Sequence, residues 1–209
     1  RQEKQGIEDS VETFYEATLE GGHNEGTPEL VHFLTDNALD SVHWMESVGV
    51  RFKDEVGSAT GSLGQRSHYP ATPYGNAYIR AFQRYIEDTG ATVQIVDETA
   101  AQTLVTDASG AVTGVSGLHR GGKEVTVKAP AVVIATGGYG ANKSLLSEDL
   151  QKSLYYGRSN ATGDGLIMSD AVNAQRQLMR YGKRYPNGGE VDDCGKHCRV
   201  QFGQRDPYQ

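Results

Sequence analysis

The stretch from residue 131 to 140, AVVIATGGYG, combines residue types that could bind a ligand. Its first five residues (131–135) are all apolar and predict a strand buried on both faces, which is typical of the middle of a parallel sheet. The strand runs into Thr136, Gly137 and Gly138, where the backbone can approach another group closely because glycine has no Cβ. Ligands of α/β proteins bind outside the carboxyl ends of strands, so the pattern predicts a bound ligand, most commonly a dinucleotide. A glycine turn that merely takes the chain out of the sheet is an equally good interpretation.

Asp164 follows Thr162 and Gly163 at the predicted start of another helix. A carboxylate at this end stabilises a helix by about 0.3–1 kcal/mol through the helix dipole. The residues alone therefore favour a structural role for Asp164, with a role in ligand binding as the alternative.

Arg66 and His68 lie close together in a glycine-flanked segment, RSHYP. A histidine beside an arginine could bind an anionic carboxylate substrate, because both side chains offer hydrogen-bond donors that can carry positive charge. The same pair could equally anchor the loop, and the sequence leaves both roles open.

Two cysteines, Cys194 and Cys198, flank His197 near the C-terminus. Structural zinc usually takes four ligands, and this segment offers only three candidates. The spacing also differs from the C-x-x-C-H pattern of covalent haem attachment. We therefore expect neither a metal site nor a haem here.

The elements that must position these residues follow helical patterns first and extended patterns later. Apolar residues at helical spacing predict helices at 10–20, 27–48 and 74–88. Alternating residues bounded by turns predict strands at 92–96, 101–106, 112–118 and 124–128. The last three strands form an antiparallel meander that leads directly into AVVIATGG.

The remaining segments have weaker patterns. Residues 50–73 show no clear period and predict a long loop. A short helix is predicted at 142–150, and a further helix from Thr162 to about Leu178. After Tyr185 the apolar pattern ends, so we expect an irregular tail.

Composition excludes several classes of protein. The 209 residues carry a net charge of −7, and the 20 lysines and arginines are scattered, so we expect no nucleic-acid partner. The apolar runs are far shorter than a membrane span, and the polar first residues are not followed by the apolar core of a signal peptide. We therefore expect a cytoplasmic protein without a membrane span.

The order of helix, strand, meander, AVVIATGGYG and then SNATGDGLIMSDAVNA resembles the flavoprotein fumarate reductase family of FAD-dependent oxidoreductases. That family includes flavocytochrome c-type fumarate reductases and urocanate reductases. The segment TLEGGHNEGTPELVHFLTDNALDSVHWMESVGV looks like the helical stretch after the family's flavin-contacting loop. RSHYP looks like its SHRP-type segment, and DASGAVTGV matches its meander. The pair of ATGG and ATGDG at this spacing is specific, and the likeness covers about residues 1–191.

The resemblance implies an α/β fold, namely part of an FAD-binding, Rossmann-like domain with an antiparallel β-meander and a helical N-terminal segment. It implies that residues 1–180 are a partial FAD-binding domain and that residues 181–209 begin the capping-domain region or form an irregular tail. It also implies FAD as the cofactor and hydride transfer from the flavin to the double bond of an unsaturated (di)carboxylate. The implied FAD-binding residues are Ala101, Ala135, Thr136, Gly137, Gly138, Thr162, Gly163 and Asp164. The implied substrate-binding residues are Arg66, His68 and Tyr185, the last at a position where the family often has histidine.

The departures from the family pattern limit these expectations. The family begins with a strand and a G-x-G-x-x-G turn that holds the FAD pyrophosphate, and this sequence contains no such motif. The proton-donating arginine of the capping domain cannot be matched either, so no catalytic residue is assigned. We expect an internal portion of a larger enzyme, with weak or no FAD binding by this chain alone. We also expect apolar surface that is exposed or covered by self-association.

Two alternatives remain open. The chain could be a non-catalytic fragment that acts as a binding or interaction module. It could also belong to a relative that uses the same flavin scaffold on a different substrate, as ketosteroid dehydrogenases and aspartate oxidases do. Flavin absorption by the purified protein would separate the first alternative from the others.

Overall fold

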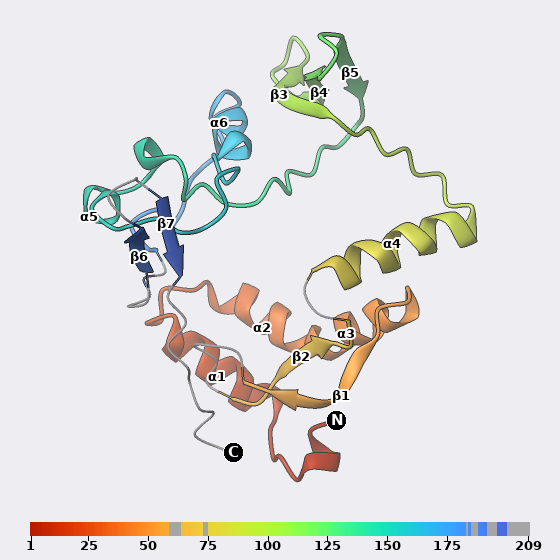
Figure 1. The fold of residues 1–209 in the computed structure, drawn as a ribbon, viewed down its shortest axis with the longest axis vertical. Coiled ribbons are helices and arrows are strands. Elements are labelled where there is room, and N and C mark those ends of the chain that lie inside the picture. The colour runs from red at the N-terminus through yellow and green to blue at the C-terminus, as the bar shows by residue number, and fades with distance from the viewer. Residues whose placement is uncertain (59–63, 73–74, 183, 185–187, 192–195, 200–209) are drawn as a thin grey trace. The chain divides into compact units, whose positions relative to one another are not determined.

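The computed structural model describes residues 1–58, 64–72, 75–182, 184, 188–191 and 196–199 (Figure 1). The chain divides into two compact units, Arg1–Ile95 and Val96–Gln209. No helix within the described residues has the length and hydrophobicity of a membrane span. The domain boundary expected near residue 180 stays a prediction.

The first unit consists of helices and one hairpin. Its elements are η1 (Glu3–Gln5), α1 (Val11–Gly21), α2 (Pro28–Asp36), α3 (Ala38–Ser47), β1 (Phe52–Gly57), β2 (Ser67–Pro70) and α4 (Asn76–Thr89). The helices predicted at 10–20 and 74–88 are confirmed as α1 and α4. At the start of α1 the hydroxyl oxygen of Ser10 accepts a hydrogen bond from the backbone N–H of Thr13, which is the expected capping contact.

The single helix predicted over 27–48 is wrong, because the chain forms two helices that meet at Asn37. Asn37 leaves the helical conformation at φ −101° and ψ 4°. Its side-chain amide donates to the carbonyl of Phe33 over 2.8 Å. Asparagine competes with helix formation through such local bonds, which explains the break despite a continuous apolar stripe.

The long loop predicted over 50–73 is also wrong, because this segment contains the antiparallel hairpin of β1 and β2. The register pairs Phe52 with Pro70 and Gly57 with Ser67. Phe52 and Val56 are buried and form most of the core of this unit together with Val48 and Val50. The three residues between Phe52 and Val56 are all charged, so the segment lacks the apolar–polar alternation of a half-buried strand and the sequence pattern does not reveal it.

The strand predicted at 92–96 is not formed. Val93 and Ile95 are 53% and 57% exposed, and the segment has no regular structure. A strand needs a neighbour that accepts its backbone hydrogen bonds, and no described strand pairs with this segment.

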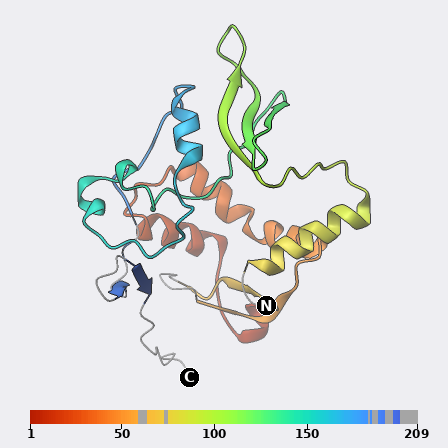
Figure 2. The same ribbon diagram turned by 45° about the horizontal axis from the view of Figure 1, so that its top comes forward.

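The second unit contains the meander and a loop-rich region. Its elements are β3 (Thr99–Thr106), β4 (Val112–His119), β5 (Glu124–Lys128), η2 (Lys143–Leu145), α5 (Glu148–Gln151), α6 (Asp164–Asp170), β6 (Gly188–Val191) and β7 (Lys196–Arg199). The order β3-β4-β5 confirms the antiparallel meander (Figure 2). The first turn is held by Asp107, whose carboxylate accepts from the backbone N–H groups of Ser109 and Ala111. These bonds lower the pKa of Asp107 below its ordinary value.

The buried strand predicted at 131–135 is not formed, and Val133 is 89% exposed. A central strand of a parallel sheet needs parallel neighbours on both sides. Every strand pair among the described residues is antiparallel. The fold is therefore a mixed α/β arrangement whose described part contains no parallel sheet of the Rossmann-like kind, although a segment suited to such a sheet is present.

Helices beyond this segment are shorter than predicted. The region 142–150 forms η2 and α5, and the helix predicted to reach Leu178 ends at Asp170. Asn173 then adopts the left-handed conformation at φ 59°, which stops the helix. Met168 is the one buried large apolar side chain of this unit within the described residues.

The irregular tail expected after Tyr185 is partly wrong. Residues 188–191 and 196–199 pair as antiparallel strands β6 and β7, with Gly188 opposite Arg199 and Val191 opposite Lys196. Tyr185 and Cys194 lie outside the described residues.

Candidate functional site

The ATGG segment and the TGDG turn lie against each other, although about 25 residues separate them. A Cβ built on Gly165 would lie 2.3 Å from Oγ1 of Thr136 and 2.6 Å from Cγ2 of Ile134. A Cβ on Gly163 would lie 2.8 Å from Cβ of Tyr139. Such distances are impossible for real side chains, so both glycines are needed for the close contact of the two segments.

Hydrogen bonds join the same two segments. The backbone N–H of Ala141 donates to the carbonyl of Ala161 over 3.0 Å. The side-chain amide of Asn142 donates to the carbonyl of Thr162 over 3.1 Å. The paired occurrence of ATGG and ATGDG in the sequence therefore corresponds to one local structure.

Gly137 and Gly138 differ from the glycines of the turn. Gly137 is left-handed at φ 80°, and no heavy atom lies within 4 Å of a Cβ built on either residue. Ala135 and Thr136 are exposed beside them. The backbone is thus open to the close approach of another group at this point, whereas at Gly163 and Gly165 the chain itself occupies the space.

Asp164 is the exposed first residue of α6. Its carboxylate accepts a hydrogen bond of 2.8 Å from the hydroxyl of Thr162. The residue at the cap position is Gly163, and no side-chain capping bond forms there. Asp164 thus occupies the first turn of α6, as the structural alternative expects of an acidic residue at a helix start, and its carboxylate also accepts from Thr162. The role of Asp164 in ligand binding stays a prediction.

Ala101 lies on β3 opposite Gly117 of β4 and is exposed. A Cβ on Gly117 would lie 2.3 Å from the carbonyl oxygen of Ala100, so the two strands approach closely here. Strand β3 packs against α6, which brings the strand that carries Ala101 beside the helix that begins at Asp164.

Arg66 belongs to the first unit, and its guanidinium contacts other side chains of the same unit. Its guanidinium donates two hydrogen bonds to the carboxylate of Asp9, at 2.5 and 2.6 Å. It also lies over the ring of Phe14, 4.9 Å from the ring centre. The hydrogen bond from Arg66 holds the pKa of the Asp9 carboxyl below its ordinary value, although burial opposes this. These contacts are those of a loop anchor, and the predicted carboxylate-binding role of Arg66 stays a prediction.

His68 lies on β2 opposite Val56 and is partly buried. Its ring meets the ring of Phe52 edge to face, with centroids 5.8 Å apart. Burial, followed by the positive charge of Arg1, lowers the pKa of His68, so the neutral ring is favoured. Its predicted partner Tyr185 lies outside the described residues, and the substrate role of the pair stays a prediction.

The region after ATGG contains a cavity that the sequence analysis missed. Its volume is about 520 Å³. The residues that line it come from three separate parts of the chain, which lie within 138–146, 150–156 and 181–184. The one local signal in the sequence was the apolar run of Leu154, Tyr155 and Tyr156, whereas Tyr181 lies 25 residues further along the chain.

No group of three His, Cys, Asp or Glu side chains that could hold a metal ion occurs within the part of the chain that the structure describes. His197 and Cys198 lie on β7, but Cys194 is outside that part. The absence of a metal site at this segment stays a prediction.

Comparisons with known proteins agree with the arrangement of these motifs. A family model described as an FAD binding domain matches residues 1–181. The chain is 29% identical over 178 residues to an NADH:fumarate oxidoreductase of Klebsiella pneumoniae, which covers 83% of this chain and 19% of that protein. It is 31% identical over 191 residues to a urocanate reductase of Eggerthella lenta, which covers 88% of this chain and 31% of that protein.

Among solved structures, the open conformation of a flavocytochrome c3 fumarate reductase matches with a TM-score of 0.71 and 27% sequence identity. The match covers 82% of this chain and 31% of that chain. The sequence thus spans between about a fifth and a third of the length of these proteins.

Proposed function

The chain belongs to the FAD binding domain family, and we propose that it forms part of an FAD-dependent oxidoreductase of the fumarate reductase type. The proposed substrate is an unsaturated (di)carboxylate. Two observations together carry the proposal. The ATGG segment lies in close contact with the TGDG turn, and the backbone at Gly137 and Gly138 stays open to another group. The similarity to a fumarate reductase and a urocanate reductase gives independent support.

The open backbone at Gly137 and Gly138 suits the binding of a dinucleotide. A diphosphate or an adenosine can approach a chain closely only where no Cβ stands in the way. We assign the adenosine and pyrophosphate side of FAD to Ala135, Thr136, Gly137 and Gly138, and the adenine edge to Ala101. When bound, FAD supplies the hydride for reduction of the substrate double bond.

The residues around Asp164 hold the turn in place beside this backbone. Gly163 and Gly165 permit the close contact with the ATGG segment, and Thr162 orients the Asp164 carboxylate. We assign Asp164 to the flavin end of the cofactor. A carboxylate fixed by a hydrogen bond loses little entropy when it accepts a further bond, which favours such a role.

The substrate carboxylate is assigned to Arg66, His68 and Tyr185. The neutral ring of His68 offers one N–H donor. Arg66 would have to share its guanidinium between Asp9 and the substrate, and its five N–H groups allow this.

Purification of the natural protein that carries this sequence tests the proposal. We expect it to contain FAD, seen as flavin absorption and released by denaturation. Gly138→Ala should lower the flavin occupancy, because the new methyl group enters space that the chain leaves open. Gly75→Ala is the matched control, since its Cβ also meets nothing within 4 Å and Gly75 belongs to no predicted site. A protein without flavin, or equal occupancy in both variants, would contradict the assignment.

Oxidation of the dithionite-reduced protein tests the substrate class. Fumarate, urocanate and acrylate are the natural choices, because relatives are named for these three compounds. We expect one of these unsaturated acids to reoxidise the flavin under anaerobic conditions. Failure of all three with a flavin-loaded protein would remove the substrate assignment but leave the FAD assignment intact.

A further inference from the structure

The cavity of about 520 Å³ in the second unit has the size of a small-molecule site. Ligand pockets in proteins usually have volumes of about 300–1,000 Å³ and are lined mostly by apolar and aromatic side chains. This cavity begins beside Gly138 and is lined by tyrosines, leucines and two cationic side chains.

The apolar walls are built by close packing. A Cβ on Gly140 would lie 2.4 Å from the ring of Tyr155, and a Cβ on Gly182 would lie 2.7 Å from Cδ2 of Leu150. The glycines therefore let the backbone press against these side chains. The result is a preformed surface of aromatic and aliphatic groups, which suits a flat apolar molecule.

The charged residues of the cavity are both cations. Lys143 and Arg184 line it, and no carboxylate of the described residues does so, although the chain as a whole carries a net charge of −7. Arg184 pairs with Asp149, but their side chains are 49% and 75% exposed. An ion pair so exposed contributes only about 0–1 kcal/mol, so the guanidinium can turn to another anion. Lys143 is exposed and has no ion-pair partner among the described residues.

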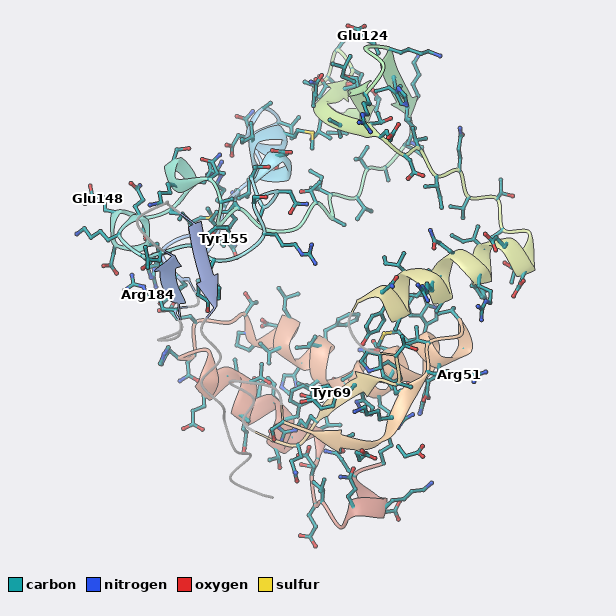
Figure 3. All side chains as sticks on the ribbon, in the orientation of Figure 1. Arg51, Tyr69, Glu124, Glu148, Tyr155 and Arg184 are labelled. Carbon is teal, nitrogen blue, oxygen red and sulfur yellow. The ribbon has the colours of Figure 1, made fainter. Side chains whose placement is uncertain are left out.

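We propose that this cavity is a binding site for a flat aromatic molecule that carries one carboxylate. Its rings lie against Tyr155, Tyr156 and Tyr181, and its carboxylate is bound by Lys143 and Arg184. Of these residues, Tyr155 and Arg184 are labelled in Figure 3. A small aliphatic diacid could satisfy the cations but would leave the aromatic walls uncovered. The site requires neither FAD nor hydride transfer and thus goes beyond the proposed function.

Calorimetric titration of the chain with 2-naphthoate tests the site. The uncharged 2-naphthamide, which has the same rings, is the control ligand. We expect one molecule of 2-naphthoate per chain, bound more tightly than 2-naphthamide, with an affinity that falls as salt screens the cations. Absence of binding, equal affinity of the two ligands or a stoichiometry of several molecules per chain would overturn the proposal.

Two lysine variants test where the carboxylate of 2-naphthoate binds. Lys143→Gln should weaken 2-naphthoate about five- to tenfold and leave 2-naphthamide unchanged, because only the charged contact is lost. Lys152→Gln is the matched control, since Lys152 is also exposed but does not line the cavity, and it should change the affinity by less than about twofold. Equal effects of the two variants would show a general charge effect and refute the site.

Competition with FAD separates this site from the cofactor site. The two sites share only Gly138, and this chain alone is expected to bind FAD weakly, so the comparison uses the flavin-loaded natural protein. We expect it still to bind one molecule of 2-naphthoate. Displacement of 2-naphthoate by FAD would assign the cavity to the cofactor and overturn the proposal. Conversely, a chain that binds 2-naphthoate but whose natural protein lacks flavin would retain this site and lose the proposed function.

Discussion

Replacement of Arg66 distinguishes an anchoring role of its guanidinium from a substrate-binding role. Arg66 joins the segment before β2 to Asp9 at the start of the chain through two hydrogen bonds, and it covers the ring of Phe14. Arg66→Ala removes all three contacts. Arg66→Lys keeps the positive charge but cannot form the paired hydrogen bonds of a guanidinium.

The expected loss of unfolding free energy follows from how exposed the Arg66–Asp9 ion pair is. Exposed ion pairs contribute about 0–1 kcal/mol, and loss of one partner from a buried pair costs about 3–5 kcal/mol. The Arg66 and Asp9 side chains are 16% and 12% exposed, on a part of the chain that is otherwise near the surface. An intermediate value of about 1.5 kcal/mol for the pair and about 0.5 kcal/mol for the ring contact is reasonable. Arg66→Ala should thus lower the free energy of unfolding by about 2 kcal/mol, and Arg66→Lys by about 1 kcal/mol.

Urea unfolding followed by circular dichroism measures these changes. A double-mutant cycle with Asp9→Asn should give a coupling energy of about 1 kcal/mol or more, because each single variant already removes the pair. The stabilisation that the Arg66–Asp9 pair contributes should also depend on pH. The pKa of the Asp9 carboxyl is held below its ordinary value of 3.8, so its contribution is complete above that value and is lost as the pH falls through the lower, folded-state pKa. The stability difference between the natural chain and Asp9→Asn should therefore be constant from neutral pH to about pH 5 and shrink below about pH 4.

An additive cycle, with no coupling between the two positions, would refute the anchoring role. So would an Arg66→Ala variant whose stability falls by less than about 0.5 kcal/mol, the range of an ordinary surface substitution. If such a variant of the flavin-loaded natural protein also lost affinity for its unsaturated acid, Arg66 would be a substrate-binding residue instead.

Three further predictions concern the second unit. Gly165→Ala should lower the stability of the chain by about 1–3 kcal/mol, measured by urea unfolding against Gly75→Ala, because its Cβ would lie 2.3 Å from a threonine hydroxyl of the ATGG segment. Asp164→Ala should lower the flavin occupancy of the natural protein with little change in its melting temperature, since the carboxylate bonds to Thr162 and caps no helix; a fall in melting temperature at unchanged occupancy would reverse the assignment. Val133→Lys should reduce self-association of the isolated chain in sedimentation velocity, because this 89% exposed side chain lies in an uncharged apolar segment; unchanged sedimentation would show that the segment makes no contact between copies.

Local features of the chain could be predicted from the sequence. The capped helix α1, the amphipathic helix α4 and the three-stranded meander follow from side-chain periodicity, capping residues and turn residues that lie next to one another in the chain. The family could also be identified, because ATGG and ATGDG each occupy a short segment and their combination is specific.

Elements that depend on distant partners could not be predicted. The segment 131–135 has the composition of a buried strand, but a strand forms only where a neighbour pairs with its backbone, and the described residues provide none. The reverse holds for β1. Its sequence does not alternate, but Phe52 and Val56 are buried in the hairpin that β1 forms with β2.

The sequence by itself determined the family, because its signal resides in short motifs, and the same motifs carry the residues that we propose for FAD binding. Only the tertiary structure decided which glycines of those motifs serve packing and which leave open space, because a missing Cβ has the same sequence letter in both cases. It also showed that Arg66 is held by Asp9, 57 positions away, and that four tyrosines and two cations are among the residues that line one cavity. Such contacts depend on how the folded chain brings distant residues together, which no local pattern encodes.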